Sequence, residues 1–161
     1  MRILEGTLRA DGQRFAIVVS RYNDFITRPL TDGALAALAE AGVAGDDITM
    51  VYVPGSFELP VAAQRLAETG RFAAVICLGC LIRGGTPHFE YIASAVSQAL
   101  ASASTATGVP VAFGVLTTNT VEEAIERAAP GSSNKGREAA VTAVQMSSLM
   151  RALEAAVERL A

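Results

Sequence analysis

The chain has a single histidine, His88, which follows a stretch with two glycines, Arg83–Pro87. An imidazole exchanges protons near neutral pH, so His88 is a candidate general acid or base, although a lone histidine is more often structural. The same stretch runs into a predicted helix, whose first N–H groups and positive dipole end attract anions. Gly85 and Thr86 are therefore candidates for binding a phosphate group, with a plain capped turn as the alternative.

Two basic residues further along the chain are also candidates for binding an anion. Lys135 is the only lysine among the 13 Lys and Arg residues, and it lies at the start of the last predicted helix. Arg127 lies in the last turn of a short predicted helix, where a cation also suits the helix dipole. A guanidinium offers a planar fork to a phosphate or a carboxylate. Solvent-exposed positions without such a role are the alternative for both residues.

Several known signatures are incomplete in this sequence. The segment Gly79–Thr86 is close to a P-loop, but Gly85 stands where the lysine belongs, so we expect no nucleoside triphosphatase. No GxGxxG follows the first predicted strand, so a dinucleotide site has no support. Cys77 and Cys80 form a CxxC, yet Cys77 lies within a predicted strand and Cys80 at its end, whereas reactive pairs open a helix. One histidine and two cysteines cannot complete a closed zinc site, and Ser56 lies in no GxSxG elbow.

Short apolar runs alternate with helical patterns along the chain. The runs lack strict polar alternation, which suits strands of a sheet covered on both faces, and they are Phe15–Ser20, Ile48–Val53, Ala73–Gly79 and Val111–Leu116. Caps, prolines and glycines predict helices over Thr27–Ala41, Phe57–Thr69, Pro87–Thr107 with Thr86 as N-cap, Thr120–Ala128 with a capping box, and Asn134–Leu160. This alternation predicts a parallel α/β sheet with right-handed crossovers, to which Met1–Arg9 is a candidate additional strand.

Ligands of open parallel sheets gather at the carboxyl ends of the strands. Four polar segments that contain most of the candidate residues follow the predicted strands, namely Arg21–Asn23, Pro54–Glu58, Cys80–His88 and Thr117–Asn119. We therefore expect them to share one rim of the sheet. Loops between strands and helices are polar in general, so the polarity of these segments does not by itself establish a site.

Length and composition limit the class of protein. A chain of 161 residues fits one domain, residues 1–161. A net charge of −3 without a basic stripe makes nucleic acid a poor partner, and the longest apolar stretch, Phe72–Ile82, is too short to cross a membrane. Two cysteines and no recognisable secretion signal in Met1–Asp11 lead us to expect a cytoplasmic protein. With 51% hydrophobic and 18% charged residues, we expect subunit contacts to cover part of the apolar surface.

Taken together, the loop sequences resemble the 6,7-dimethyl-8-ribityllumazine synthase family. The matching stretches occur in the family's order and spacing, and they are Ser20–Thr27 (SRYNDFIT), Val53–Pro60 (VPGSFELP), Gly79–Tyr91 (GCLIRGGTPHFEY), Gly114–Asn119 (GVLTTN) and Asn134–Ala140 (NKGREAA). The resemblance implies a flavodoxin-like, three-layer α/β sandwich with a central, mostly parallel four-stranded sheet and helices on both faces. It also implies a transferase that condenses 5-amino-6-(D-ribitylamino)uracil with 3,4-dihydroxy-2-butanone 4-phosphate, releasing phosphate and water without a metal or redox cofactor.

The resemblance implies roles for individual residues. Tyr22, where the family usually has Phe or Trp, would stack on the pyrimidine, and His88 would move protons during imine formation, phosphate loss and ring closure. The other implied contacts are Ser56, Phe57 and Glu58 to the ribityl chain, the backbone of Cys80, Leu81 and Ile82 to the pyrimidine edge, Gly85 and Thr86 to the phosphate, and Phe113, Arg127 and Lys135 from a neighbouring subunit. Glu138 matches a family acid that could orient His88.

The family resemblance also bears on assembly. It implies a homopentamer, and in some members a hollow shell of twelve pentamers, 60 subunits in all. The short turn Ala129–Ser133 favours the shell, although Pro130 could stiffen the turn in a pentamer-only form, and riboflavin synthase as a partner stays open. Position 85 is often acidic, alanine or serine in the family, and Gln145 replaces a commonly acidic residue. Two other classes remain as alternatives: a flavin- or lumazine-binding protein without turnover, and a shell or scaffold protein.

Overall fold

A computed structural model describes residues 1–160, which contain alternating strands and helices. The strands are β1 (Phe15–Ser20), β2 (Ile48–Val53), β3 (Ala74–Ile82) and β4 (Val111–Thr118). The helices are α1 (Asp24–Glu40), α2 (Leu59–Glu68), α3 (His88–Thr107), α4 (Val121–Ala128) and α5 (Lys135–Glu158), with 3₁₀ turns η1 (Gly45–Asp47) and η2 (Ser56–Glu58) before β2 and α2.

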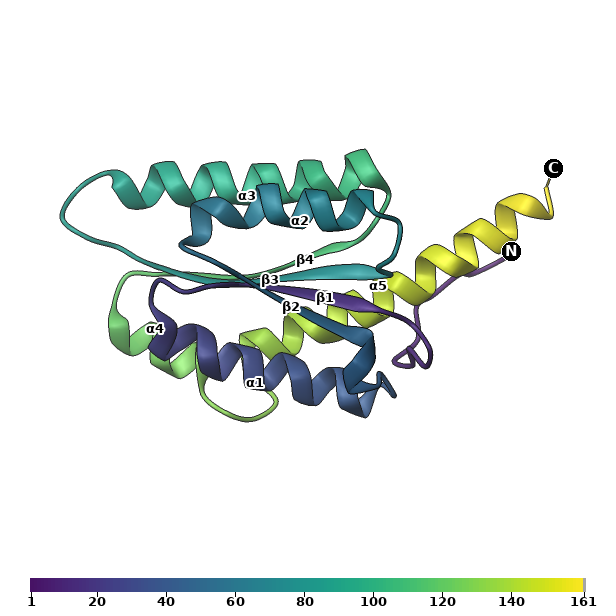
Figure 1. Ribbon diagram of the computed structural model, residues 1–161, viewed down its shortest axis with the longest axis horizontal. Helices are drawn as coiled ribbons and strands as arrows, with labels where there is room; N and C mark the ends of the chain where they lie inside the picture. Colours follow the sequence, from purple (N-terminus) through teal and green to yellow (C-terminus); the bar gives the residue numbers. More distant parts are fainter. Residues whose placement is uncertain (161) are drawn as a thin grey trace.

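The strands described in residues 1–160 form one parallel sheet of four, in the order β2-β1-β3-β4. Helices α2 and α3 cover one face, and α1, α4 and α5 cover the other, so that the sheet is the middle of three layers (Figure 1). The predicted three-layer, flavodoxin-like sandwich is therefore confirmed, and every observed strand pair is parallel.

The apolar strands fill two separate cores, one on each face of the sheet. Residues such as Ile17 and Ile76 face α1 and α5, whereas Val18 and Val75 face α2 and α3. Strands β1 and β3 lie in the middle of the sheet, and every residue of β1 is buried. Burial on both faces explains why these strands read as continuous apolar runs without polar alternation.

The predicted bounds of β1 and β2 are confirmed, but β3 and β4 extend further than predicted. Strand β3 runs to Ile82 and β4 to Thr118, because the ladder between them continues to the pair Ile82–Thr118. By contrast, β1 pairs with β3 only as far as Val19 and Leu78. Backbone pairing between β3 and β4 therefore carries β3 to the end of the apolar stretch Phe72–Ile82, and it carries β4 past Leu116, where the predicted apolar run ends.

Three predicted helix starts were wrong. Helix α2 begins at Leu59 rather than at Phe57, because Ser56–Glu58 form the 3₁₀ turn η2. Helix α1 begins three residues before Thr27, at Asp24, because Asn23 adopts a left-handed conformation that turns the chain into the helix. Helix α3 begins at His88 after Pro87, without a side-chain capping hydrogen bond, so Thr86 is not the predicted N-cap. In α4 the predicted cap is confirmed, since the Thr120 hydroxyl accepts a hydrogen bond from the Glu123 N–H at 3.1 Å.

The prediction of a strand over Met1–Arg9 was wrong, because no strand is found in residues 1–14 of the described chain. This segment runs beside α5, whose second half projects past the rest of the molecule (Figure 1). A side chain replaces the ladder of a partner strand: the Thr7 N–H donates to the Ser148 hydroxyl at 2.6 Å, and that hydroxyl donates back to the Thr7 carbonyl at 3.3 Å.

The start of α5 is held tightly against α1. A Cβ atom at Gly136 would collide with the Leu30 carbonyl, so only glycine allows this close approach of the two helices. Asn134, the N-cap, accepts from the Arg137 N–H at 2.9 Å and donates to the carbonyls of Pro29 and Ala128 at 3.1 and 2.8 Å. These contacts fix the position from which Lys135 projects.

Candidate active site

The carboxyl ends of β1, β2 and β3 surround a cavity of about 830 Å³, which we call the rim cavity. The expectation that the polar loops share one rim is thus confirmed for the first three segments. The side chains and backbone that line the cavity come from Tyr22, Asn23, Pro54–Glu58, Cys80–Ile82, Gly84, Thr86, His88, Phe89, Tyr91 and Ile92. The segment after β4 lies beside this rim, where the Arg83 N–H donates to the Thr118 carbonyl at 2.8 Å.

The first loop presents an aromatic ring to solvent. The aromatic residue is Tyr22, which is 70% exposed. Its backbone is fixed, because its N–H donates a hydrogen bond to the Pro54 carbonyl at 3.1 Å. The neighbouring Arg21 N–H donates to the Val53 carbonyl at 2.9 Å. A rigid backbone with an open ring face is suited to stacking on a planar heterocycle.

The second loop places a hydroxyl deep in the rim cavity. Ser56 is buried at the start of the 3₁₀ turn η2, while Phe57 is exposed and Glu58 is half-buried. Ser56 packs over β3 at Gly79, where an added Cβ would lie 2.6 Å from the Ser56 Oγ. The turn therefore offers a hydroxyl and a carboxylate that can hydrogen-bond a chain of hydroxyl groups.

The third loop supplies polar backbone groups. In a strand, successive residues direct their N–H and C=O groups to opposite neighbours. The Arg83 N–H reaches β4, and the Cys80 carbonyl accepts from the Asn23 Nδ2 on the β1 side at 3.0 Å, so the N–H and C=O of Ile82 also point to the β1 side. Because β1 has ended there, Ile82 can offer a donor and an acceptor to the edge of a heterocycle.

The rest of the third loop leads into α3. Gly84 and Thr86 line the rim cavity, Gly85 lies exposed between them, and His88 is the first residue of the helix. The Arg83 guanidinium stands over the Phe89 ring at 4.5 Å from its centre and donates to the Asn119 side chain at 2.9 Å. It also pairs with Glu90. These contacts tie both ends of the loop to the segment after β4.

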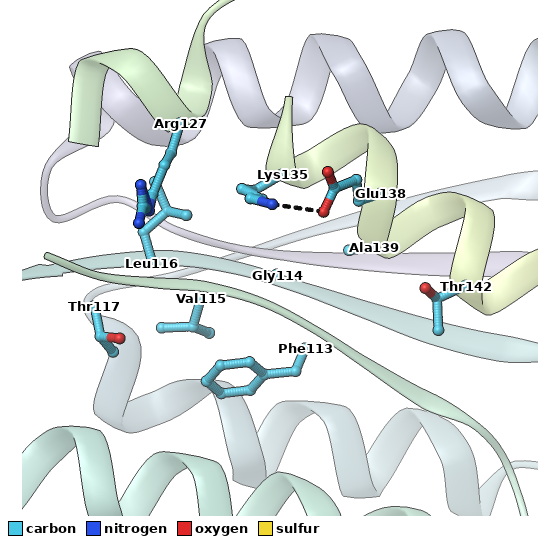
Figure 2. A pocket seen from close by; sticks show the side chains of 10 residues that line it. All are labelled: Phe113, Gly114, Val115, Leu116, Thr117, Arg127, Lys135, Glu138, Ala139 and Thr142. Carbon is cyan, nitrogen blue, oxygen red and sulfur yellow. Dashed lines mark hydrogen bonds and ion pairs between the residues drawn. The ribbon is translucent and has the colours of Figure 1, made fainter. Parts of the chain in front are cut away.

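Phe113, Arg127 and Lys135 lie in a second cavity of about 450 Å³ along the edge strand β4, which we call the β4 groove. Phe113, 47% exposed, lies on one side of β4, and Arg127, Lys135 and Glu138 lie on the other (Figure 2). The Lys135 Nζ and a Glu138 carboxylate oxygen are 2.8 Å apart. Within residues 1–160, no residue lines both cavities, so one chain does not bring Phe113, Arg127, Lys135 or Glu138 together with His88.

The two cysteines are placed as expected for a structural pair. Cys77 and Cys80 are free, buried thiols of β3. Burial raises the pKa of Cys77 to about 12 and that of Cys80 to about 11, which disfavours the reactive thiolate.

Residues 1–160 contain no group of three His, Cys, Asp or Glu side chains placed to hold a metal ion. Over the same residues, no helix is both long and apolar enough to cross a membrane.

Comparison with known proteins decides the family. The family model described as 6,7-dimethyl-8-ribityllumazine synthase matches residues 12–151. A protein of that name from Syntrophus aciditrophicus (strain SB) is 57% identical over 149 residues, which cover 92% of this chain and 97% of the relative. The chain belongs to this family. In this lumazine synthase family chain, the predicted motifs form the walls of the rim cavity and of the β4 groove.

Sequence reasoning missed several residues of the rim cavity in this lumazine synthase family chain. Asn23, Phe89, Tyr91 and Ile92 also line the rim cavity. The α3 residues escaped notice because aromatic and aliphatic side chains at helical spacing usually indicate core packing. Asn23 carried a usable signal, since an asparagine between a strand and a helix is suited to a left-handed turn.

Proposed function

We propose that this chain catalyses the condensation of 5-amino-6-(D-ribitylamino)uracil with 3,4-dihydroxy-2-butanone 4-phosphate to 6,7-dimethyl-8-ribityllumazine, releasing phosphate and water. This is the penultimate step of riboflavin biosynthesis and makes the chain a transferase. The observation that carries the proposal is the 57% identity over 92% of the chain to a protein named 6,7-dimethyl-8-ribityllumazine synthase. The rim cavity supports it, because it combines an exposed aromatic ring, hydrogen-bonding groups and an imidazole.

The ribitylaminouracil occupies the rim cavity in this proposal. Tyr22 stacks on the pyrimidine ring, and the segment Cys80–Ile82 hydrogen-bonds its edge through the β1-facing N–H and C=O of Ile82, because the Cys80 carbonyl is held by Asn23 and Leu81 faces β4. The Ser56 hydroxyl, the Phe57 backbone and the Glu58 carboxylate hold the ribityl hydroxyls. This assignment is supported by the free β1-facing side of Ile82 and by the buried position of Ser56.

The phosphorylated ketone lies beside the start of α3. Gly85 and Thr86 hold its phosphate, which the first N–H groups of the helix also attract. His88 then transfers protons as the 5-amino group attacks the ketone carbonyl, water leaves to give the imine, and phosphate departs. Ring closure onto the ribityl-bearing nitrogen with loss of water completes the lumazine. No step requires a metal or a redox cofactor.

The β4 groove completes the site of a neighbouring copy. In this arrangement Phe113 packs on the neighbour's pyrimidine, and Arg127 and Lys135 bring positive charge to its phosphate. Glu138 is then available to orient the neighbour's His88. The separation of the β4 groove from the rim cavity within one chain supports this division.

We propose a cytoplasmic homopentamer, and the short turn Ala129–Ser133 favours the assembly of pentamers into a shell of 60 subunits. Light scattering on a sizing column distinguishes the monomer, the pentamer and the shell.

The reaction is tested with purified protein and both substrates. Formation of the fluorescent lumazine at a rate above the uncatalysed condensation supports the proposal. A chain that binds lumazine tightly without forming it would instead be a binding protein, and a chain that assembles but neither binds nor reacts would be a scaffold. The His88→Gln variant serves as the control for contaminating enzyme.

The shared site is tested by mixing subunits. His88→Gln damages only the rim cavity, and Arg127→Ala damages only the β4 groove. In randomly mixed rings of the two variants, about a quarter of the interfaces join an intact rim to an intact groove, so activity should recover above that of either variant alone. Mixed rings with no recovered activity, or a catalytically active monomer, would overturn the shared site.

A further inference from the structure

Asn23 is unusual in both its backbone and its side chain. Its φ of 61° and ψ of 46° place it in the left-handed region, and it is the one non-glycine residue with positive φ in residues 1–160. It is half-buried and lines the rim cavity directly after Tyr22. Asparagine tolerates this conformation better than most residues, but still at an energetic cost. The surrounding contacts must therefore hold it there.

The backbone of Asn23 turns the chain from β1 into α1. Its carbonyl accepts hydrogen bonds from the N–H groups of Ile26 and Thr27, at 2.9 and 3.1 Å, and so makes the first bonds of the helix. The Thr27 hydroxyl donates back to the Ser20 carbonyl, at 2.9 Å. From this turn the Asn23 side chain reaches across the end of β1 to β3.

The side chain of Asn23 takes the place of a strand partner. Beyond the pair Val19–Leu78, β1 provides no further ladder to β3, and the Asn23 Nδ2 donates to the Cys80 carbonyl at 3.0 Å. Cys80 directs its backbone groups to the same side as Ile82, two residues further along. The Asn23 amide thus fixes Cys80. The next backbone groups of β3 on the same side are the N–H and C=O of Ile82, which are open to the rim cavity.

We infer that Asn23 is a positioning residue for the ribitylaminouracil, because its amide sets the pyrimidine-reading backbone of Cys80–Ile82 while its left-handed turn sets Tyr22. This inference rests on the proposed function. Its effect is confined to one substrate, because the Arg83 N–H is held by Thr118 on the other side of β3 at 2.8 Å. The loop that carries Gly85 and Thr86 therefore has an anchor that is independent of Asn23.

Two variants separate the side chain from the backbone. Asn23→Gly keeps the left-handed turn without strain but removes the amide, and Asn23→Asp keeps the shape but has no N–H to donate to Cys80. We expect both variants to fold and to raise the KM for ribitylaminouracil about tenfold, as for the loss of one partly buried hydrogen bond. The KM for the butanone phosphate should change less than about twofold in both variants.

Thr27→Val is the matched control. It removes a hydrogen bond of the same turn, from the Thr27 hydroxyl to Ser20, but not the link to Cys80. We expect it to lower the melting temperature while leaving the KM of both substrates within about twofold. A purely structural role for Asn23 would give Asn23→Gly the same pattern, and that result, or equal changes in both KM values, would overturn the inference.

A binding measurement separates this inference from the proposed function. Fluorescence titration with 6,7-dimethyl-8-ribityllumazine reports the rim cavity without turnover, and Asn23→Gly should bind about tenfold more weakly than the unmodified chain. If the unmodified chain binds lumazine but forms none, the proposed function fails while the role of Asn23 is still decided by this titration. Equal affinity of the two proteins overturns the inference, and a chain that neither reacts nor binds overturns both.

Discussion

The rim cavity and the β4 groove offer different chemical groups. The rim cavity presents Tyr22, the buried hydroxyl of Ser56, open backbone groups and His88, but its lining includes no arginine or lysine. The β4 groove presents Arg127 and Lys135 with one acid, Glu138. Because a polyol-bearing heterocycle needs hydrogen bonds and a phosphate needs positive charge, neither surface alone suits both proposed substrates. In the proposed function, the groups for one reaction are therefore divided between two surfaces of the chain.

The two regions also differ in rigidity. Hydrogen bonds to the backbone join the ends of β1 and β2, of β1 and β3, and of β3 and β4 around the rim cavity, whereas long exposed side chains make up the charged side of the β4 groove. An exposed pair such as Lys135–Glu138 contributes little to stability, so Lys135 can exchange its carboxylate for another anion at low cost. The rim cavity is thus preformed, while the β4 groove can adapt when it meets a partner.

The largest expected effect is on the proton-transfer group of the rim cavity. His88→Gln should lower kcat by roughly 10–10³-fold, at the lower end of the roughly 10²–10⁴-fold that general acid–base catalysis usually contributes, while the oligomer persists. Orientation of two reactive partners would account for the remaining rate. Steady-state kinetics measure the effect, with circular dichroism and light scattering as controls for folding and assembly. An unchanged kcat would remove His88 from the mechanism.

The next effect tests the charge of the β4 groove. Arg127→Ala should raise the KM for the butanone phosphate roughly 10–150-fold, as for the loss of one charge-assisted hydrogen bond. The KM for ribitylaminouracil should change far less, since its proposed contacts lie in the rim cavity. Separate KM measurements decide the matter. Equal changes for both substrates would indicate that Arg127 serves only the end of α4.

A smaller effect is expected from crowding the floor of the rim cavity. Gly79→Ala places a methyl group 2.6 Å from the Ser56 Oγ and 3.1 Å from Leu59, so the hydroxyl must move. We expect a loss of roughly 1–3 kcal/mol in the free energy of unfolding and a severalfold higher KM for ribitylaminouracil. Gly45→Ala is the control, because an added Cβ there meets nothing within 4 Å. Similar kinetics for the two variants would contradict the proposed role of Ser56.

Most of the fold was predictable from local sequence signals. The apolar runs predicted the observed bounds of β1 and β2, and the capping box marked the start of α4. These signals depend on residues close together in the chain. The ends of β3 and β4 were missed because pairing between residues distant in sequence extends them to Ile82 and Thr118.

The sequence predicted which residues belong to the candidate site, but not that they lie on two separate surfaces of the chain. The rule that ligands gather at strand ends placed Tyr22, Ser56 and His88 correctly on one rim. However, only the family resemblance predicted that Phe113 and Arg127 act in the site of a neighbouring subunit. Local sequence signals could not predict this, because the position of β4 at the edge of the sheet depends on the strand order. The wrong prediction of a strand over Met1–Arg9 has a similar cause, because the backbone of this segment is bonded at Thr7 to the side chain of Ser148, far away in sequence.

The smallest expected effect concerns the support of the β4 groove by α1. Glu40 of α1 pairs with Arg137 in the first turns of α5, at 3.0 Å for one of the two contacts, and the Arg137 guanidinium lowers the pKa of the Glu40 carboxyl below its ordinary 4.5. A lowered pKa in the folded state means that the pair stabilises the fold above about pH 4.5 and that this stability is lost as the pH falls through the folded value.

Glu40→Gln should therefore lower the melting temperature slightly at neutral pH and make no difference once the carboxyl is protonated. The two proteins are compared by thermal unfolding between neutral pH and the acid range. Arg9 also lowers the pKa of Asp11, so Asp11 makes the stability of both proteins depend on pH in the same direction. Subtracting the melting temperature of the variant from that of the unmodified chain at each pH removes this shared contribution and leaves that of Glu40. At neutral pH, lumazine binding to the rim cavity should be the same in both proteins. A variant that is equally stable at every pH would show that α1 holds the start of α5 through Gly136 and Asn134 alone.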